Sequence, residues 1–305
     1  MKVYAVKANK YGDPEPPRKR LDMSNTSVGF IGLGLMGNPI ARRLARQGFA
    51  VTGCDIHGPT LEAFDEEGTA RAADPIEAAR GKDFVGICVR TDDQLRNLAG
   101  DGRIFEAQGD GGIFIITSTV APGLAQELEE IARPYGVSVI DVGVSGGHHY
   151  ALEGKLSLFV GGDDETIARA REWLEAIGTI SHLGPVGRGL QGKLLNNLAC
   201  IANYGLAASI LDIGVALDFD REQLREALQR GSAQSFALQV VPGMVGWREN
   251  STAEGVADLR DLLAKDVYLS RDLVAAEDPA MSALQNACHV LLRRMDQAAS
   301  ELAGK

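Results

Sequence analysis

The alternation of apolar and polar residues along the first 187 residues is typical of an α/β domain. Short apolar runs of strand length are separated by segments in which apolar residues recur at helical spacing. The predicted strands are Val28–Ile31, Ala50–Asp55, Asp83–Val89, Gly112–Ile116, Val137–Val144, Leu156–Val160 and Ile180–Leu183. The predicted helices are a segment after Gly37, then Thr60–Glu67, Pro75–Arg80, Asp92–Leu98, Pro122–Arg133 and Asp163–Ile177. This order predicts a doubly wound, mostly parallel Rossmann-type sheet.

The pattern changes at Gly187. Leu190–Leu217 is a long helical pattern with almost no charge, and such a helix has to be buried against other protein. Only helices follow, at Arg221–Gln229, around a break at Pro242, at Asp258–Ala276 and at Pro279–Leu302. We therefore expect an α/β domain over residues 25–187 and an all-helical C-terminal domain over residues 188–305. Residues 1–24 are expected to be a dispensable tail, and the apolar helix predicts a homodimer or homotetramer.

Composition narrows the functional class. The net charge of −10 argues against a nucleic-acid or anionic-membrane surface as partner. No apolar run approaches the roughly 20 residues of a membrane span, and the first 22 residues lack the apolar segment of a signal peptide. The four cysteines show no metal-binding or C-x-x-C spacing. We expect a cytoplasmic protein with free thiols and no metal.

A glycine motif follows the first predicted strand. Gly32, Gly34 and Gly37 have G-x-G-x-x-G spacing and lead into a helix, an arrangement that lets a pyrophosphate approach the backbone at a helix N-terminus. Asp55 ends the second strand, near the roughly 20-residue offset of an acid that binds the adenosine ribose. A carboxylate there favours two free ribose hydroxyls and repels a 2′-phosphate. The motif therefore predicts a dinucleotide cofactor, NAD rather than NADP.

Two further segments carry candidate chemistry. Ser145–Gly147 follows a strand, and its backbone N–H groups suit a carboxylate or phosphate, although a plain glycine turn explains the same residues. Lys193 begins a helix otherwise free of charge, with Asn197 on the same face. In an apolar cleft, desolvation would lower the lysine pKa toward a range useful for proton transfer, whereas at the surface it would be an ordinary solvated lysine.

Together these motifs resemble the β-hydroxyacid dehydrogenase family from Val28 to about Leu302. GFIGLGLMG resembles the family's cofactor loop, and DVGVSGG its substrate-binding D-x-P-V-S-G-G segment, with Gly143 where proline is usual. GRGLQGKLLNN is similar to the G-x-G-x-x-x-K-x-x-N-N catalytic stretch, and LLAKDVYL to the C-terminal K-D motif. Ser118 and Thr119 fit a cofactor-side loop, although Ile116 stands where the family usually has aspartate.

The resemblance implies hydride transfer between NAD and a small anionic 3-hydroxy acid similar to 3-hydroxyisobutyrate. Lys193 would be the general acid/base, and Asn197 would bind the same substrate oxygen or orient the lysine. The implied substrate-binding residues are Ser145, Gly146, Gly147, His148 and Lys265. The implied cofactor-binding residues are Gly32, Gly34, Leu35, Met36, Gly37, Asp55, Val89, Thr119 and Lys265. NADP-preferring relatives commonly have Asn-Arg after the second strand, whereas this chain has Asp55–Ile56–His57.

The sequence does not decide whether the substrate carries a second polar or anionic group besides its carboxylate. His148 and His149 either recognise a polar or anionic group of the substrate or are solvated loop residues, and Arg90 is a weaker candidate for the same task.

Other functions are weighed against this one. GVSGG also matches the G-x-S-x-G elbow of a serine hydrolase, which would use Ser145, but the serine is expected to precede a loop and a strand rather than a helix. A decarboxylating 6-phosphogluconate-type dehydrogenase shares the architecture but usually has His-Asn at Asn196–Asn197 and a longer chain. A non-catalytic NAD sensor and an imine reductase are disfavoured by Lys193.

Overall fold

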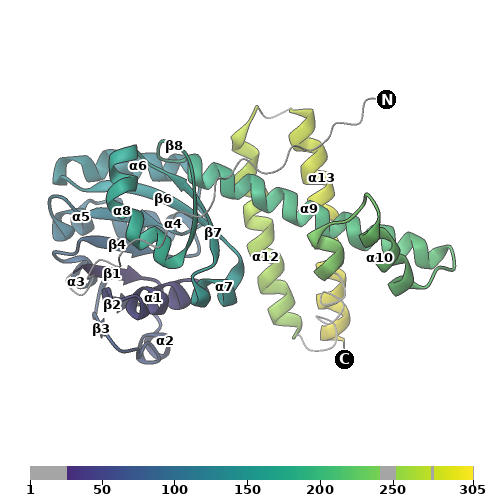
Figure 1. The fold of residues 1–305 in the computed structure, drawn as a ribbon, viewed down its shortest axis with the longest axis horizontal. Coiled ribbons are helices and arrows are strands. Elements are labelled where there is room, and N and C mark those ends of the chain that lie inside the picture. The colour runs from purple at the N-terminus through teal and green to yellow at the C-terminus, as the bar shows by residue number, and fades with distance from the viewer. Residues whose placement is uncertain (1–25, 241–251, 276–277, 305) are drawn as a thin grey trace.

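The protein is built on one eight-stranded sheet, which a computed structural model describes together with its helices for residues 26–240, 252–275 and 278–304 (Figure 1). The strands are β1 (Ser27–Ile31), β2 (Ala50–Cys54), β3 (Thr69–Arg71), β4 (Phe84–Ile87), β5 (Ile113–Ile116), β6 (Ser138–Ser145), β7 (Leu156–Gly161) and β8 (Gly178–Gly184). Their order is β3-β2-β1-β4-β5-β6-β7-β8. All neighbours pair in parallel except β6 and β7, so the predicted doubly wound, mostly parallel sheet is confirmed.

Helices cover both faces of the sheet, which explains why the central strands are continuous apolar runs. The helices α1 (Gly37–Arg46) and α8 (Asp164–Ile177) pack on one face, in a core that contains Phe30 and Trp173. The other face is covered by α3 (Pro75–Ala79), α4 (Asp92–Ala99), α5 (Arg103–Gln108) and α6 (Pro122–Ala132), which is followed by the short η2 (Arg133–Tyr135). The strands β4 and β5 lie between the two cores with every residue buried.

The structure corrects the prediction at four elements of this sheet region. The sequence pattern missed β3 because this edge strand has only three residues, none of them buried. It missed α5 because six residues between Gly102 and Gly109 are too few for a helical period. The predicted loop after Ser145 is instead helix α7 (Gly147–Glu153), and α2 (Gly58–Glu62) begins and ends earlier than predicted.

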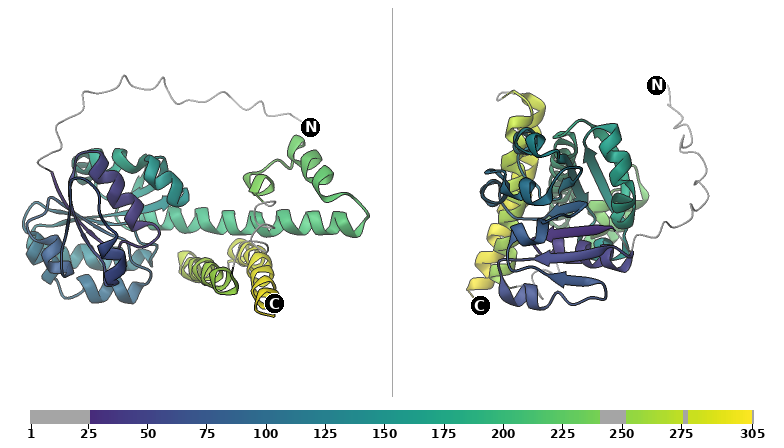
Figure 2. Two further views of the ribbon diagram at one scale, coloured as in Figure 1. Left: turned by 90° about the horizontal axis from the view of Figure 1, so that it is seen from below. Right: turned by 90° about the vertical axis from the view of Figure 1, so that its left-hand side faces the viewer.

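The C-terminal part consists of helices, as predicted, among the residues that the structure describes. The helix α9 (Arg188–Ala216) runs from the sheet as one long rod, and α12 (Ala253–Leu269) and α13 (Pro279–Ala303) cross it (Figure 2). The helix α10 (Arg221–Arg230) packs at its far end, and η3 (Ser270–Leu273) follows α12. The sequence placed α12 too late, since Thr252 caps it at its start. The predicted tail of residues 1–24 and the break at Pro242 lie outside the described residues.

Helix α9 has two apolar faces, and only one is covered. Its first turns pack on β6 and β7, and its buried side chains form a third core with α12 and α13. By length and composition α9 could cross a membrane, so the expectation that no apolar run approaches a span is wrong. The covered face of α9 is buried against the sheet, α12 and α13 of the same chain. On its other face, Leu206, Ile210 and Ile213 are 46–60% exposed.

Candidate active site

The loop between β1 and α1 requires two of its glycines and leaves space at the third. Gly32 has φ +87°, and a Cβ there would lie 2.2 Å from the carbonyl oxygen of Cys88. A Cβ at Gly37 would lie 1.9 Å from the carbonyl oxygen of Gly32. A Cβ at Gly34 would have no atom within 4 Å, so the backbone there is open to a ligand. The loop therefore fits the close approach of a cofactor pyrophosphate.

Asp55 lies where the sequence places it, at the carboxyl end of β2. Its carboxylate accepts the backbone N–H of Leu33 at 2.6 Å and that of His57 at 2.8 Å, which fixes its orientation beside the glycine loop. It lines a cavity of about 710 Å³ together with Gly32, Gly34 and Val89. Asp55 is thus held in a space next to the glycine loop, as an adenosine-ribose site requires.

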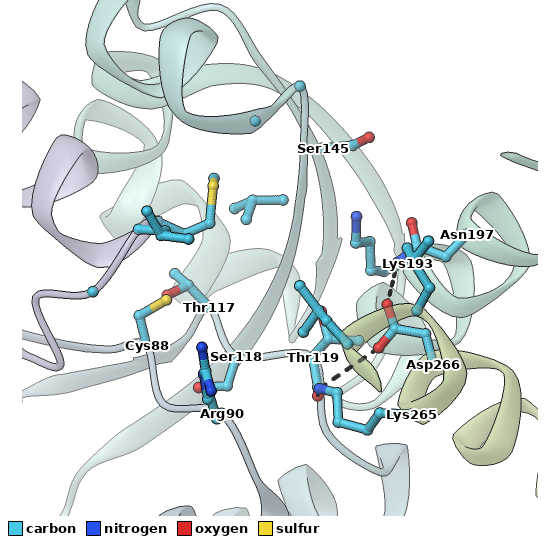
Figure 3. A pocket seen from close by; sticks show the side chains of 18 of the residues that line it. Cys88, Arg90, Thr117, Ser118, Thr119, Ser145, Lys193, Asn197, Lys265 and Asp266 are labelled. Carbon is cyan, nitrogen blue, oxygen red and sulfur yellow. Dashed lines mark hydrogen bonds and ion pairs between the residues drawn. The ribbon is translucent and has the colours of Figure 1, made fainter. Parts of the chain in front are cut away.

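A second cavity of about 520 Å³ lies between the sheet and the helices and brings together four separated motifs (Figure 3). The predicted residues that line it are Gly34, Leu35, Met36, Gly37, Val89, Thr119, Ser145, Gly146, Gly147, Lys193, Asn197 and Lys265. The loops after β4 and β5 are tied together, since the Val89 N–H donates to Ser118 Oγ at 2.7 Å. Lys265 of α12 reaches across the cavity and donates from Nζ to the carbonyl oxygen of Thr119 at 2.5 Å.

Lys193 is a buried amine at the centre of this cavity. Only 9% of the residue is exposed, and burial lowers its pKa, while the nearby Asp266 carboxylate raises it. Strand β6 passes directly beneath it, because a Cβ at Gly143 would lie 2.4 Å from Lys193 Cβ. This contact accounts for glycine at position 143, since a larger residue would displace the helix that carries the lysine.

Asp141 anchors the start of α9 to the sheet. The N-cap residue of α9 is Gly187, which has no side chain that could accept a hydrogen bond from the first turn. The buried Asp141 carboxylate on β6 accepts instead from the backbone N–H of Gly187 and that of Leu190, each at 2.6 Å. Burial raises the pKa of Asp141, and the backbone hydrogen bonds oppose that shift. One residue therefore fixes Lys193 relative to Ser145 at the end of the same strand.

Two residues that the sequence reasoning left out of the site complete it. Asp266 is buried, and its Oδ2 accepts from Asn197 Nδ2 at 2.6 Å. Asn196 Nδ2 donates to Asn197 Oδ1 at 3.1 Å and to Ser145 Oγ at 3.4 Å. Asp266 Oδ1 faces Lys265 Nζ at 3.6 Å. Burial raises the pKa of Asp266, and Lys265, the Asn197 hydrogen bond and Lys193 lower it. The K-D pair in the sequence was the available signal for Asp266.

His148 is the one predicted site residue that the structure places elsewhere. Its ring is exposed, lies at 3.1 Å from the carbonyl oxygen of Leu35 and does not line the cavity. His149 pairs with Glu153 at 2.8 Å. Arg90 does line the cavity, on the side opposite Lys193 (Figure 3).

The structure also corrects the reason given against a serine hydrolase. Ser145 does stand between a strand and a helix, as a nucleophile elbow requires. Its side chain is paired with Asn196, however, and neither neighbouring histidine contacts it. Among the described residues, the two neighbouring histidines are thus engaged elsewhere, and no serine–histidine pair forms at Ser145.

Comparison with known proteins agrees with this geometry. The family model described as the NAD binding domain of 6-phosphogluconate dehydrogenase matches residues 27–188. The chain is 31% identical to the NAD-dependent L-serine dehydrogenase of Pseudomonas aeruginosa, over 82% of this chain and 85% of that protein. It is 30% identical to the mitochondrial 3-hydroxyisobutyrate dehydrogenase of Mus musculus, over 82% of this chain and 76% of that protein.

Solved structures share the fold. Mycobacterium tuberculosis 3-hydroxyisobutyrate dehydrogenase, solved with L-serine, superposes with a TM-score of 0.77 at 24% identity, covering 91% of this chain and 99% of that chain. Psf3 in complex with NADP⁺ and 2-OPP superposes with a TM-score of 0.73 at 24% identity, covering 90% of this chain and 99% of that chain.

Proposed function

The chain belongs to the β-hydroxyacid dehydrogenase family, and on that premise we propose that it oxidises the carbinol of a small 3-hydroxy acid with NAD, using Lys193 as general acid/base. The observation that carries the proposal is the buried amine of Lys193, which shares one cavity with the glycine loop and with Ser145–Gly147. A buried amine with a lowered pKa is neutral, and thus basic, at lower pH than a solvated lysine.

Each step of the proposed reaction has a residue of this chain to perform it. The backbone N–H groups of Gly146 and Gly147 and the Ser145 hydroxyl hold the substrate carboxylate. Lys193 then accepts the proton of the substrate hydroxyl as the hydride leaves the carbinol carbon. Asn197, held by Asp266, orients the same oxygen. A bound nicotinamide ring supplies the hydride acceptor.

The preference for NAD over NADP is part of the proposal and rests on Asp55. Its carboxylate stands at the end of β2 with no arginine at the next two positions, Ile56 and His57. The Pseudomonas aeruginosa relative is named as NAD-dependent, whereas Psf3 has a structure with NADP⁺. The charge of Asp55 favours the first of these cofactors, because it repels a 2′-phosphate.

We further propose that a second copy of the chain covers the exposed face of α9. Leu195, Leu206, Ile210, Ile213 and Leu217 lie within about 60° of one another on a helix with 3.6 residues per turn, and each is 46–66% exposed. An uninterrupted apolar stripe of this kind marks an interaction surface. A symmetric dimer is the commonest way to bury one.

Initial rates with 3-hydroxyisobutyrate test the reaction and the cofactor together. We expect NADH formation with a higher kcat/KM for NAD than for NADP, and a loss on the order of 10²–10⁴ in kcat for Lys193→Ala. Lys155→Ala is the matched control, because that lysine is exposed and pairs with Glu153. Near-normal turnover by Lys193→Ala would remove the assignment of the base, and a higher kcat/KM with NADP would overturn the cofactor preference.

A further inference from the structure

The active-site cavity continues along α9 beyond Lys193 and Asn197. Cys200, Ile201 and Tyr204 line this continuation from α9, and Leu262 and Leu263 line it from α12. None of these five side chains has a part in the hydride or proton transfer described above. They form what we term the outer pocket.

The outer pocket lies in line with the catalytic amine. Lys193, Asn197, Cys200 and Tyr204 fall within about 60° of one another around the helix, and Cys200 lies about 10 Å along the axis from Lys193. Side chains on a helix lean toward its N-terminus, so the Tyr204 ring covers the turn that precedes it. The side of the outer pocket that α9 forms therefore begins next to Lys193 and faces α12 across the same cavity.

The wall of the outer pocket is uncharged. Burial and a hydrogen bond with Cys200 raise the pKa of Tyr204, so the phenol stays neutral. Leu262 is 45% exposed although it lines the cavity, so apolar surface is left for a ligand to cover. The charged residues that line the same cavity are Arg90, Lys193, Lys265 and Asp266, and none of the five outer-pocket residues is charged. An ionised group that packs against these five side chains would lose hydration without gaining a counter-charge from them.

We propose that the natural substrate carries an apolar substituent larger than methyl at C2, a branched alkyl or aryl group, which lies between Cys200, Tyr204 and Leu262. This inference rests on the proposed function, because the carboxylate at Ser145–Gly147 and the carbinol at Lys193 set which part of the substrate enters the outer pocket. The methyl group of 3-hydroxyisobutyrate would leave most of this wall, which is about 10 Å long, uncovered.

A series of 3-hydroxypropionates that differ only at C2 tests the proposal in the native protein with NAD. The substituents are hydrogen, methyl, isobutyl, benzyl and carboxymethyl. We expect kcat/KM to rise by about tenfold or more from methyl to isobutyl or benzyl, the scale on which apolar pockets discriminate. We expect the anionic carboxymethyl acid to fall below the methyl acid. Equal values across the series, or a maximum at carboxymethyl, would overturn the proposal.

Filling the outer pocket gives a second readout. Cys200→Phe is expected to lower kcat/KM for the benzyl acid by tenfold or more, while 3-hydroxypropionate stays within about threefold of the native value. Cys200→Leu, a smaller change, should also lower kcat/KM for the benzyl acid, by less than Cys200→Phe, and should leave 3-hydroxypropionate near its native value. Ala168→Phe is the matched control, because that residue is exposed on α8, outside both the cavity and the apolar stripe of α9. Equal losses for all acids in both Cys200 variants would contradict a substituent site.

Calorimetric titration of Lys193→Ala with the same acids, in the presence of NAD, separates this inference from the reaction it rests on. Binding about tenfold tighter for the benzyl acid than for 3-hydroxyisobutyrate is expected. If this ranking holds but the native protein oxidises none of the acids, the proposed reaction fails and the outer pocket stands. If the acids are oxidised and bind without any ranking, the outer-pocket proposal alone fails.

Discussion

At the scale of single residues, Lys193 is subject to two opposing influences. Burial favours its neutral form, and the Asp266 carboxylate favours its protonated form. Asp266 is itself held by Asn197 and lies 3.6 Å from Lys265, so its position is fixed from two sides. The proposed proton acceptor and the carboxylate that affects its pKa therefore come from two different helices, α9 and α12.

Asp266→Asn is expected to move the acid limb of the pH profile to lower pH. The carboxylate raises the pKa of Lys193, so its removal lowers that pKa further and leaves the amine neutral at lower pH. In the oxidation direction kcat/KM should therefore begin to rise at lower pH. In the reduction direction, which needs the protonated amine, activity should be lost at lower pH.

Asp258→Asn is the control for this experiment, since it removes the same charge from an exposed position on the same helix and should leave both profiles in place. An unchanged profile for Asp266→Asn, or a shift to higher pH, would show that Asp266 does not act on Lys193.

The sequence identified the residues whose chemistry is unusual for their surroundings, and it missed those that act through distant contacts. Lys193 stood out because its helix has almost no other charge, with only Arg188 and Asp212 along 29 residues. The role of Asp266 depends on a contact with Asn197, 69 residues earlier in the chain, which no local pattern reveals. The substrate-binding role of His148 stays a prediction, and no local pattern indicates the Leu35 carbonyl oxygen that its ring contacts.

At the scale of elements, the joint between β6 and α9 sets the geometry of the site. Asp141 takes the place of a helix cap, and Gly143 lets the helix lie against the strand. Such a joint replaces the usual local cap with a partner 46 and 49 residues away.

Asp141→Ala is expected to destabilise the protein and to lower kcat together. The change leaves two buried backbone N–H groups without an acceptor, at a cost of about 1–3 kcal/mol each, and frees the first turn of α9. The control is Asp163→Ala, which removes an ordinary cap of α8 and should cost about 1 kcal/mol without affecting kcat. Thermal unfolding midpoints and initial rates measure both. Equal midpoints for the two variants, or a native kcat in Asp141→Ala, would contradict this account.

The elements themselves were predicted best where a single feature decides them. The strands β4 and β5 are buried on both sides, and their apolar runs identify them. The helix α7 was missed because Gly146, Gly147 and two histidines favour a loop locally, whereas the helix is stabilised by its packing on α1 and α8. The hydrophobic periodicity of a short segment does not reveal tertiary contacts of this kind.

At the scale of the whole molecule, α9 presents opposite faces to the active site and to solvent. The exposed stripe at Leu206, Ile210 and Ile213 lies about 100–180° around the helix from Lys193 and Tyr204. The mostly parallel character of the sheet followed from the sequence, because alternating strands and helices imply βαβ units. The use of the exposed stripe did not, since the apolar character of α9 fits a buried helix and an interface equally well.

Ile210→Glu is expected to reduce the molecular mass in solution to that of one chain, because it places a charge in the stripe that the second copy would cover. Light scattering at micromolar concentration measures the mass. Ala168→Glu on the exposed side of α8 introduces the same charge elsewhere and should leave the assembly intact. A native protein that is already monomeric, or an Ile210→Glu variant of unchanged mass, would refute the proposed dimer.

The anchoring of α9 by Asp141 separates what is invariant in this enzyme from what is adjustable. The first turn is held on the sheet, so the distance between Lys193 and the segment Ser145–Gly147 is set before the helix reaches Cys200. Replacements from Cys200 onward can therefore redirect the catalyst to a different metabolite without disturbing the machinery that performs the oxidation. A new substrate preference is therefore expected to evolve with least disruption through substitutions in the later turns of α9.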